Sequence, residues 1–321
     1  MPNPTLAKVE WRDATRQQAK ACIAIDGLPG EGKSGLALLI AYTLAGGDWK
    51  KVYGCDTENR SLDLFQGIST STGDQFKGFR KFDLLPIHGY APSNYLAIKD
   101  SAKKNGALAF INDSATHMWT GPGGVLSLVS DAKAKDGKMD NYRVWGLPNI
   151  KSEKDSIVDC IRDSDVHMIS TIRVKEKFEM TNEDGKSKLL SMGEQQIMMP
   201  DLKYEPDLVL SMVSPGSITG KAPVALVTKS RYAIFEKGQE YQFTQGLLDQ
   251  LKAYLAEGAD PEELKEQQRL ELVAMITDLL DHDASKRTVF PFLKENAGYK
   301  DVELTKLDIK VLKNLYSQLI S

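Results

Sequence analysis

Short apolar runs alternate with amphipathic stretches over the N-terminal half of the chain. Runs of about four to eight apolar residues bounded by turn residues are typical of buried strands, and longer stretches with an apolar position every third or fourth residue are typical of helices. This alternation predicts an α/β fold with a mainly parallel central sheet. The predicted strands are Cys22–Ile25, Lys51–Cys55, Phe82–Ile87, Ala107–Asp113 and Val166–Ile172. The predicted helices are Gly35–Ala45, Ser93–Lys104 and Lys151–Asp163.

In the following part of the chain, strands come in direct succession. Turns at Pro215-Gly216 and Lys237-Gly238 separate them, which predicts antiparallel edge strands on the parallel sheet. The polar stretch Phe178–Met199 predicts a hairpin or a mobile loop. The predicted strands here are Tyr204–Val213, Ala222–Thr228, Tyr232–Phe235 and Tyr241–Phe243.

The C-terminal part has a helical pattern. A helix over Gln245–Ala256 ends before Gly258, and Asp260-Pro261 supplies the N-cap and first residue of another. We therefore predict an N-terminal extension at 1–20, a core at 21–258 and a small C-terminal helical domain at 259–321. From Asp260 onward the chain has 12 acidic and 9 basic residues, which favours a protein partner over DNA. The predicted helices of this domain are Glu262–Asp281, Ser285–Asn296 and Thr305–Ile320.

Composition narrows the class of protein. The 321 residues are 41% hydrophobic, as in globular proteins, and the formal charge of −3 means that DNA binding would depend on local groups of cations. The longest apolar run, Leu36–Ala45, is too short for a membrane span, and no secretory leader is recognisable, so we expect a cytoplasmic protein. Because the cysteines and histidines lack metal-ligand spacing, we expect buried thiols and structural imidazoles.

The residues after the first predicted strand fit the pattern G-x-x-x-x-G-K-[ST]. In such a loop the glycines turn backbone N–H groups towards phosphate oxygens, and the helix N-terminus adds partial positive charge. Lys33 is predicted to contact the β and γ phosphates of ATP, and Ser34 to bind Mg²⁺. The predicted phosphate loop consists of Gly27, Leu28, Pro29, Gly30, Glu31, Gly32, Lys33, Ser34 and Gly35.

Acidic residues follow two further predicted strands. Glu58 lies where α/β sheets bind ligands and is a candidate base for the water that attacks the γ phosphate, with Asp56 next in line and a solvated loop carboxylate as the alternative. Asp113 ends an apolar strand and has the form of a Mg²⁺-holding aspartate. The polar Asn112 before it leaves open a shift of this assignment by one residue.

Cations and aromatic residues are interleaved in Trp119–Ile150, which we expect to be a loop, and a second group of cations follows the predicted strand that ends at Ile172. Such residues can grip a phosphate backbone and stack on bases, but they also occur in solvated surface loops. The candidate DNA-binding residues are Lys133, Lys135, Tyr142, Trp145, Arg173, Lys175 and Lys177.

The order of these motifs resembles the RecA-like P-loop NTPase core of recombinases. The matching segments are the phosphate loop, Asp56-Thr57-Glu58, Asp113-Ser114, Ile172 to Lys175, Leu202-Lys203-Tyr204 and Lys229-Ser230-Arg231. The resemblance covers about Ala21–Phe243 and is closest to short RecA-like ATPases of bacteriophages that act as single-strand-annealing recombination proteins.

The resemblance implies a Mg²⁺-dependent ATPase that forms a ring or filament of identical subunits. Thr171 would sense the γ phosphate, at a position where the family often has glutamine. Lys229 and Arg231 would stabilise the transition state in the neighbouring subunit. Two loops, Trp119–Ile150 and Arg173–Ile197, would face single-stranded DNA, in the host cytoplasm if a phage encodes the chain. The C-terminal helices could contact a recombination or single-strand-binding protein.

We therefore expect an oligomeric ATPase that binds single-stranded DNA and promotes annealing or strand exchange in recombination. A RecA-type replication motor or helicase loader is the first alternative, and strand displacement would identify it. The second is an ATP-switched interaction module with little turnover, which DNA-stimulated hydrolysis would argue against.

Overall fold

The computed structural model describes residues 16–69, 76–183, 186–216, 221–282 and 304–320, and over 177–193 it describes the backbone alone. The chain divides into two compact units. The larger unit spans Ala19–Leu255, and the smaller one combines Ala256–Ser321 with Met1–Gln18. In the smaller unit Gln17 forms a parallel bridge with Ala259.

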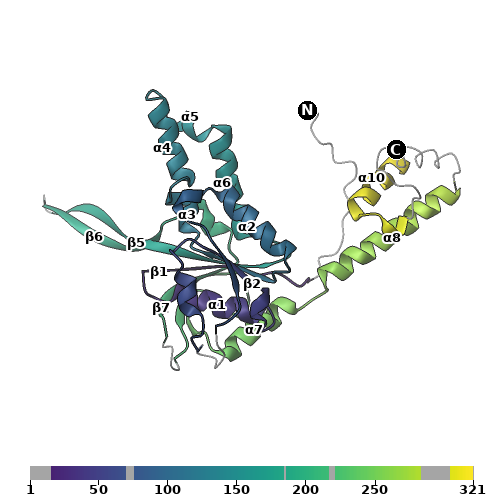
Figure 1. Cartoon of the computed structure of the whole chain (residues 1–321), viewed down its shortest axis with the longest axis horizontal. Coiled ribbons are helices and arrows are strands. Elements are labelled where there is room, and N and C mark those ends of the chain that lie inside the picture. The colour runs from purple at the N-terminus through teal and green to yellow at the C-terminus, as the bar shows by residue number, and fades with distance from the viewer. Residues whose placement is uncertain (1–15, 70–75, 184–185, 217–220, 283–303, 321) are drawn as a thin grey trace. The chain divides into compact units, whose positions relative to one another are not determined.

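A mostly parallel, mixed sheet forms the centre of the larger unit, which has the predicted α/β class (Figure 1). The strand order is β3-β2-β4-β5-β1-β7-β8-β9, and β6 pairs with β5 off this path. Pairs from β3 to β7 are parallel, whereas β7–β8 and β8–β9 are antiparallel, which confirms the predicted antiparallel edge. The strands are β1 (Cys22–Gly27), β2 (Val52–Asp56), β3 (Arg80–Asp83), β4 (Ala109–Asp113), β5 (His167–Glu183), β6 (Lys186–Gln196), β7 (Leu208–Ser214), β8 (Val224–Ser230) and β9 (Glu240–Gln242).

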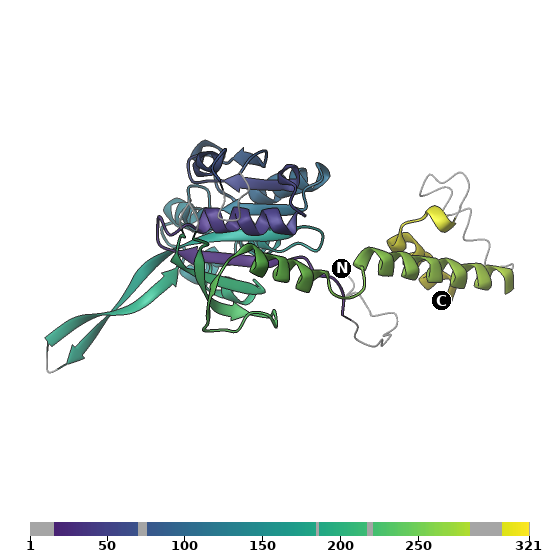
Figure 2. The same ribbon diagram turned by 90° about the horizontal axis from the view of Figure 1, so that it is seen from below.

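Helices cover both faces of this sheet because its central strands are apolar on both sides (Figures 1 and 2). In β1, Ile23 and Ile25 point into one hydrophobic core and Ala24 into the other, as the alternation of side chains along a strand requires. The first core contains α1 (Lys33–Leu44) and α7 (Gln245–Ala256). The second contains α2 (Pro92–Lys104) and α6 (Pro148–Ile161).

The stretch Trp119–Ile150 is helical, so the prediction of a loop is wrong. Val125 and Val129, one helical turn apart, are buried in the second core. The glycine and proline residues that suggested a loop lie at helix ends, with Gly124 as an N-cap and Pro148 as a first residue. The additional helices are α3 (Thr116–Thr120), α4 (Val125–Lys135) and α5 (Asn141–Trp145).

The described residues of Arg173–Ile197 form the two strands of a β-hairpin. Up to Arg173, β5 pairs with β1 inside the sheet, and from Val174 onward it pairs with β6 instead. The hairpin therefore leaves the sheet at Arg173, and its two strands extend beyond the sheet in both views (Figures 1 and 2). This confirms the hairpin interpretation of the polar stretch, although the predicted turn at Asp184-Gly185 lies outside the described residues.

The predicted strand at Tyr232–Phe235 is a turn. The backbone N–H of Phe235 donates to the carbonyl of Tyr232 at 3.0 Å, and both rings are buried in the first core. The apolar spacing that suggested a strand therefore reflects a turn whose side chains pack inward.

The described residues of the smaller unit include the helices α8 (Pro261–His282) and α10 (Ile309–Ile320). They pack on each other through the buried residues Ile276, Leu280, Leu312 and Leu315. The predicted helix Ser285–Asn296 lies outside the described residues. Within the described ranges, no helix is both long and apolar enough to cross a membrane. The described part of the chain also has the short 3-10 helices η1 (Trp49–Lys51), η2 (Ser61–Phe65), η3 (Pro86–His88), η4 (Pro200–Tyr204) and η6 (Leu304–Lys306).

Candidate functional site

The predicted phosphate loop connects the end of β1 to the start of α1. Gly30 and Gly32 have left-handed φ angles of 84° and 86°, and a Cβ atom at Gly32 would lie 2.8 Å from Pro215. No side chain caps the N-terminus of α1 at Gly32, and its first turn has no acidic residue. The loop therefore leaves the positive end of a helix open towards an anion.

Lys33 folds back over this loop. Its Nζ donates hydrogen bonds to the carbonyl oxygens of Gly27 at 2.9 Å and Leu28 at 2.8 Å. Burial lowers the pKa of Lys33, and the nearby carboxylates of Asp113 and Glu31 oppose that shift. The ammonium group thus lies within the loop, where phosphate oxygens could replace the two carbonyl acceptors.

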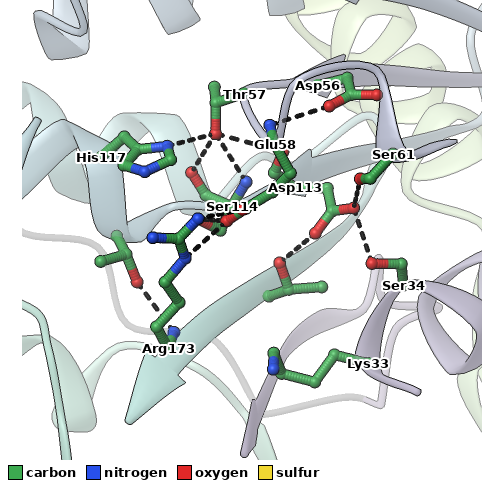
Figure 3. A network of polar contacts seen from close by, with 12 residues as sticks. Lys33, Ser34, Asp56, Thr57, Glu58, Ser61, Asp113, Ser114, His117 and Arg173 are labelled. Carbon is green, nitrogen blue, oxygen red and sulfur yellow. Dashed lines mark hydrogen bonds and ion pairs between the residues drawn. The ribbon is translucent and has the colours of Figure 1, made fainter. Parts of the chain in front are cut away.

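Asp113, at the end of β4, is bonded to the first turn of α1. Its Oδ2 accepts from the Ser34 hydroxyl at 2.7 Å, and its Oδ1 accepts from Thr171 at 2.5 Å (Figure 3). Burial raises the pKa of Asp113, and these two hydrogen bonds oppose the rise. Ser61, at the start of η2, lies 3.4 Å from Oδ2. No motif in the sequence had indicated Ser61.

Asn112 faces the opposite side of β4. Its Nδ2 donates to the carbonyl of Cys160 at 3.0 Å and to the Ser170 hydroxyl at 3.1 Å. Successive residues of a strand point to opposite faces, so Asn112 and Asp113 cannot exchange roles without a shift of the whole strand. The structure therefore places Asp113, and not Asn112, beside Ser34.

Glu58 lies just beyond β2 and is held by two side chains. Its Oε1 accepts from the Ser114 hydroxyl at 2.7 Å and from Nε of Arg173 at 2.8 Å, and the Arg173 guanidinium also donates to Oε2 (Figure 3). Burial by itself would raise the pKa of Glu58, but the hydrogen bonds and charge of Arg173 outweigh it and the pKa is lowered. Glu58 is thus a partner in a network, and not a solvated loop carboxylate.

Asp56, the other candidate base, has a structural role. Its two carboxylate oxygens accept from the backbone N–H groups of Glu58 at 2.9 Å and Leu62 at 3.0 Å. Asp56 is also buried at the end of β2. It therefore shapes the turn that carries Glu58, and both its oxygens are engaged in doing so.

His117 and Thr57 form a support beside Glu58. Nδ1 of His117 lies 2.7 Å from the Thr57 hydroxyl, which accepts from the backbone N–H of Ser114 at 2.9 Å. The His117 ring stacks on Tyr90 at 4.9 Å between centroids, and burial lowers its pKa. The sequence predicted a structural histidine at this position and had no signal that His117 lies next to Glu58.

Strand direction explains why these residues meet. β1, β2, β4 and β5 are parallel, and the register pairs Asp56 with Asp113 and Ile25 with Thr171. The carboxyl ends of parallel strands share one edge of a sheet, so residues far apart in sequence are collected there. We call this edge of the sheet the nucleotide edge, after the ligand that its loop is predicted to bind.

Lys229 and Arg231 lie towards the opposite end of the strands, where the parallel strands begin. Ser230 pairs with Leu208, which in turn pairs with Ile23 near the start of β1. Nζ of Lys229 donates to the carbonyl of Lys203 at 2.9 Å, and Arg231 contacts Asp207 at 2.9 Å. The phosphate loop of the same subunit follows the far end of β1, so these two cations do not join it.

The candidate DNA-binding residues fall on three elements, α4, α5 and β5. Lys133 and Lys135 lie in the last turn of α4, and Tyr142 on α5 is 90% exposed. Trp145 is half-buried and stacks on Trp119 at 5.8 Å between centroids, so its ring is used in packing. The remaining candidates lie on β5, where Arg173 is paired with Glu58, Lys175 is exposed, and Lys177 belongs to the stretch with undescribed side chains.

The donor set is suited to Mg²⁺ shared with phosphates. Among the described residues, no three His, Cys, Asp or Glu side chains cluster as a metal cage. Mg²⁺ needs no such cage, because it commonly keeps its waters and takes one or two protein oxygens together with phosphate oxygens. The adjacent oxygens of Ser34 and Asp113 meet that requirement.

A scan against protein-family models and a search of curated proteins find no match to this chain.

Proposed function

We propose that this chain is a Mg²⁺-dependent, RecA-like ATPase that binds single-stranded DNA and promotes annealing or strand exchange as an oligomer. The observation that carries the proposal is the meeting of Lys33, Ser34, Glu58 and Asp113 at one edge of a parallel sheet. The order of motifs along the sequence supports the RecA-like assignment and the role in recombination.

Each side chain at this edge has a task that its surroundings support. Lys33, with the N-terminus of α1, would bind the β and γ phosphates of ATP. Ser34 and Asp113 would hold Mg²⁺, which when bound neutralises charge on the phosphate oxygens. Thr171 fixes one oxygen of Asp113 and leaves the other to Ser34.

Glu58 is the proposed base. Its carboxylate is ionised at neutral pH, and release from the contacts that lower its pKa would make it a better acceptor for a proton from water. Glu58 follows β2, and β2 pairs with β4, the strand that ends at Asp113. The proton acceptor and the proposed Mg²⁺ ligands therefore share one edge of the sheet. Its pairing with Arg173 has to loosen before Glu58 can act, since both of its oxygens accept from that guanidinium.

The position of Lys229 and Arg231 supports an oligomer. They lie at the sheet edge away from the phosphate loop of their own chain, and a second copy could bring its phosphate loop to them. Cations supplied by a neighbour are a recurrent means of stabilising charge in phosphoryl transfer. Arg231 would have to leave Asp207, a rearrangement that its 54% exposed side chain permits.

The test is to measure ATP hydrolysis and the annealing of complementary fluorescent strands by the full chain, with and without Mg²⁺ and single-stranded DNA. We expect hydrolysis that requires Mg²⁺ and rises with DNA, and faster annealing in the presence of ATP. Binding of ATP and DNA without turnover would favour an ATP-switched module, for which the engaged state of Glu58 is the supporting observation. Displacement of a paired strand would favour a replication motor, and failure to bind ATP would refute all three readings.

A further inference from the structure

Both strands of the hairpin are tied to the nucleotide edge where they leave the sheet. On β5, Arg173 pairs with Glu58. On β6, the side-chain amide of Gln196 donates to Asp26, which directly precedes the phosphate loop. The two strands are joined there, because the backbone N–H of Ile197 donates to the carbonyl of Arg173 at 2.8 Å.

The backbone of Arg173 is held, so that its side chain is the part able to move. The backbone N–H of Arg173 donates to the Thr116 hydroxyl at 2.9 Å, and its carbonyl accepts from Ile197. The Arg173 side chain is 41% exposed, compared with 20% for Glu58. A guanidinium on a fixed backbone with an open face can rotate towards a new anion while the carboxylate stays in place.

The paired Glu58 is a poor base. Oε1 already accepts from Ser114 and Arg173, and Oε2 accepts from Arg173. Charge-assisted, bidentate bonds of this kind stabilise the ionised carboxylate and oppose its protonation. A base must take up a proton as water attacks, so the same bonds that keep Glu58 ionised slow that step.

We infer that Arg173 couples nucleic acid to hydrolysis: it restrains Glu58 in the free protein and releases it when a DNA phosphate on the hairpin takes the guanidinium. A guanidinium group binds phosphate in the same bidentate geometry in which it binds a carboxylate. The exchange therefore replaces one bidentate partner of Arg173 with another. Lysine lacks this fork, which is why Lys175 cannot replace Arg173 in the exchange. The inference rests on the proposed function and makes Arg173 a positioning residue that acts through Glu58.

The test compares Arg173→Gln with the parent chain, measuring ATP turnover across a titration with oligo(dT). Loss of the restraint should raise the DNA-free rate on the order of tenfold or more, because an available general base contributes about 10² to 10⁴-fold. The rate of Arg173→Gln should then respond little to DNA. Arg173→Lys should fall between the two proteins, since it keeps the charge and loses the fork.

Two controls identify the route. Arg173→Gln combined with Glu58→Gln should lose the gained rate, which shows that the gain passes through Glu58. Lys104→Gln removes an exposed cation at the end of α2. Its rate of ATP hydrolysis without DNA, and the increase in that rate with DNA, should equal those of the parent. Melting temperatures of all variants establish that the folded proteins are being compared, and Arg173→Lys serves if Arg173→Gln does not fold.

The inference would be overturned if Arg173→Gln or Arg173→Lys hydrolyses ATP without DNA no faster than the parent and is still stimulated by DNA. Arg173 would then either support Glu58 as a base or have no effect on it. In that result the parent still hydrolyses ATP and the proposed function stands. A parent that never hydrolyses ATP, with or without DNA, refutes the proposed turnover and the inference together.

Discussion

The nucleotide edge and the elements predicted to face DNA hold their polar side chains in different ways. At the nucleotide edge, Asp113 and Thr171 are buried and bonded to each other. On α4 and α5, Lys135 and Tyr142 are exposed. The activity of a site built from fixed, dehydrated groups depends strongly on each of them, whereas exposed groups each add a small, independent amount to binding. Arg173 belongs to both regions and is the point at which one can influence the other.

The largest effect should come from Glu58→Gln. Loss of the proton acceptor should slow turnover by about 10² to 10⁴-fold while ATP binding is kept, because glutamine preserves the shape of the side chain. Steady-state hydrolysis and equilibrium ATP binding measure the two quantities. Glu240→Gln, an exposed substitution on β9, is the matched control. Undiminished turnover would show that the base lies elsewhere. The contrast between strongly dependent buried groups and weakly contributing exposed groups would then fail at this residue.

Arg231→Ala should lower turnover by about 10² to 10³-fold without reducing ATP binding, since one preformed donor to developing charge contributes about that much. Lys229→Ala should have a smaller effect. Mixing Arg231→Ala protein with Lys33→Ala protein tests the geometry, because a mixed interface combines an intact phosphate loop with an intact Arg231. If subunits exchange and no activity returns, the role across the interface is refuted.

Lys33→Ala should weaken ATP binding by about tenfold to a hundredfold, because a hydrogen bond to a charged group contributes about 1.5 to 3 kcal/mol. Fluorescent-nucleotide titration measures this change. Lys50→Ala removes an exposed lysine from η1 and should leave the affinity unchanged. Equal affinity in Lys33→Ala and the parent would contradict the phosphate-loop assignment.

The smallest effect should separate the two aromatic candidates on α5. Tyr142→Ala should weaken oligo(dT) binding by about 1 to 3 kcal/mol, the usual contribution of base stacking, with an unchanged melting temperature. Trp145→Ala should lower the melting temperature and leave the DNA affinity of the folded protein alone, because its ring packs on Trp119. The reverse pattern would mean that Trp145 contacts bases and that α5 turns its other face to DNA.

Much of the nucleotide edge was predictable because its signals are local or follow from strand direction. The loop from Gly27 to Ser34 requires only a strand, glycines and a helix in sequence, and the structure has these elements there. Glu58 and Asp113 each follow an apolar strand, and parallel strands bring such residues to one edge. The helices of Trp119–Ile150 were missed because glycine and proline mark both loops and helix ends.

Other features depend on which distant segments pack together. Glu58 and Arg173 are 115 residues apart, and their pairing follows from the placement of β5 between β4 and β1. The opposite position of Arg231 likewise follows from the antiparallel direction of β8. Local periodicity determines where strands and helices form, because it reports which side of each is buried. Local periodicity does not determine which strands become neighbours. Contacts between side chains that are remote in sequence therefore form only when the sheet assembles.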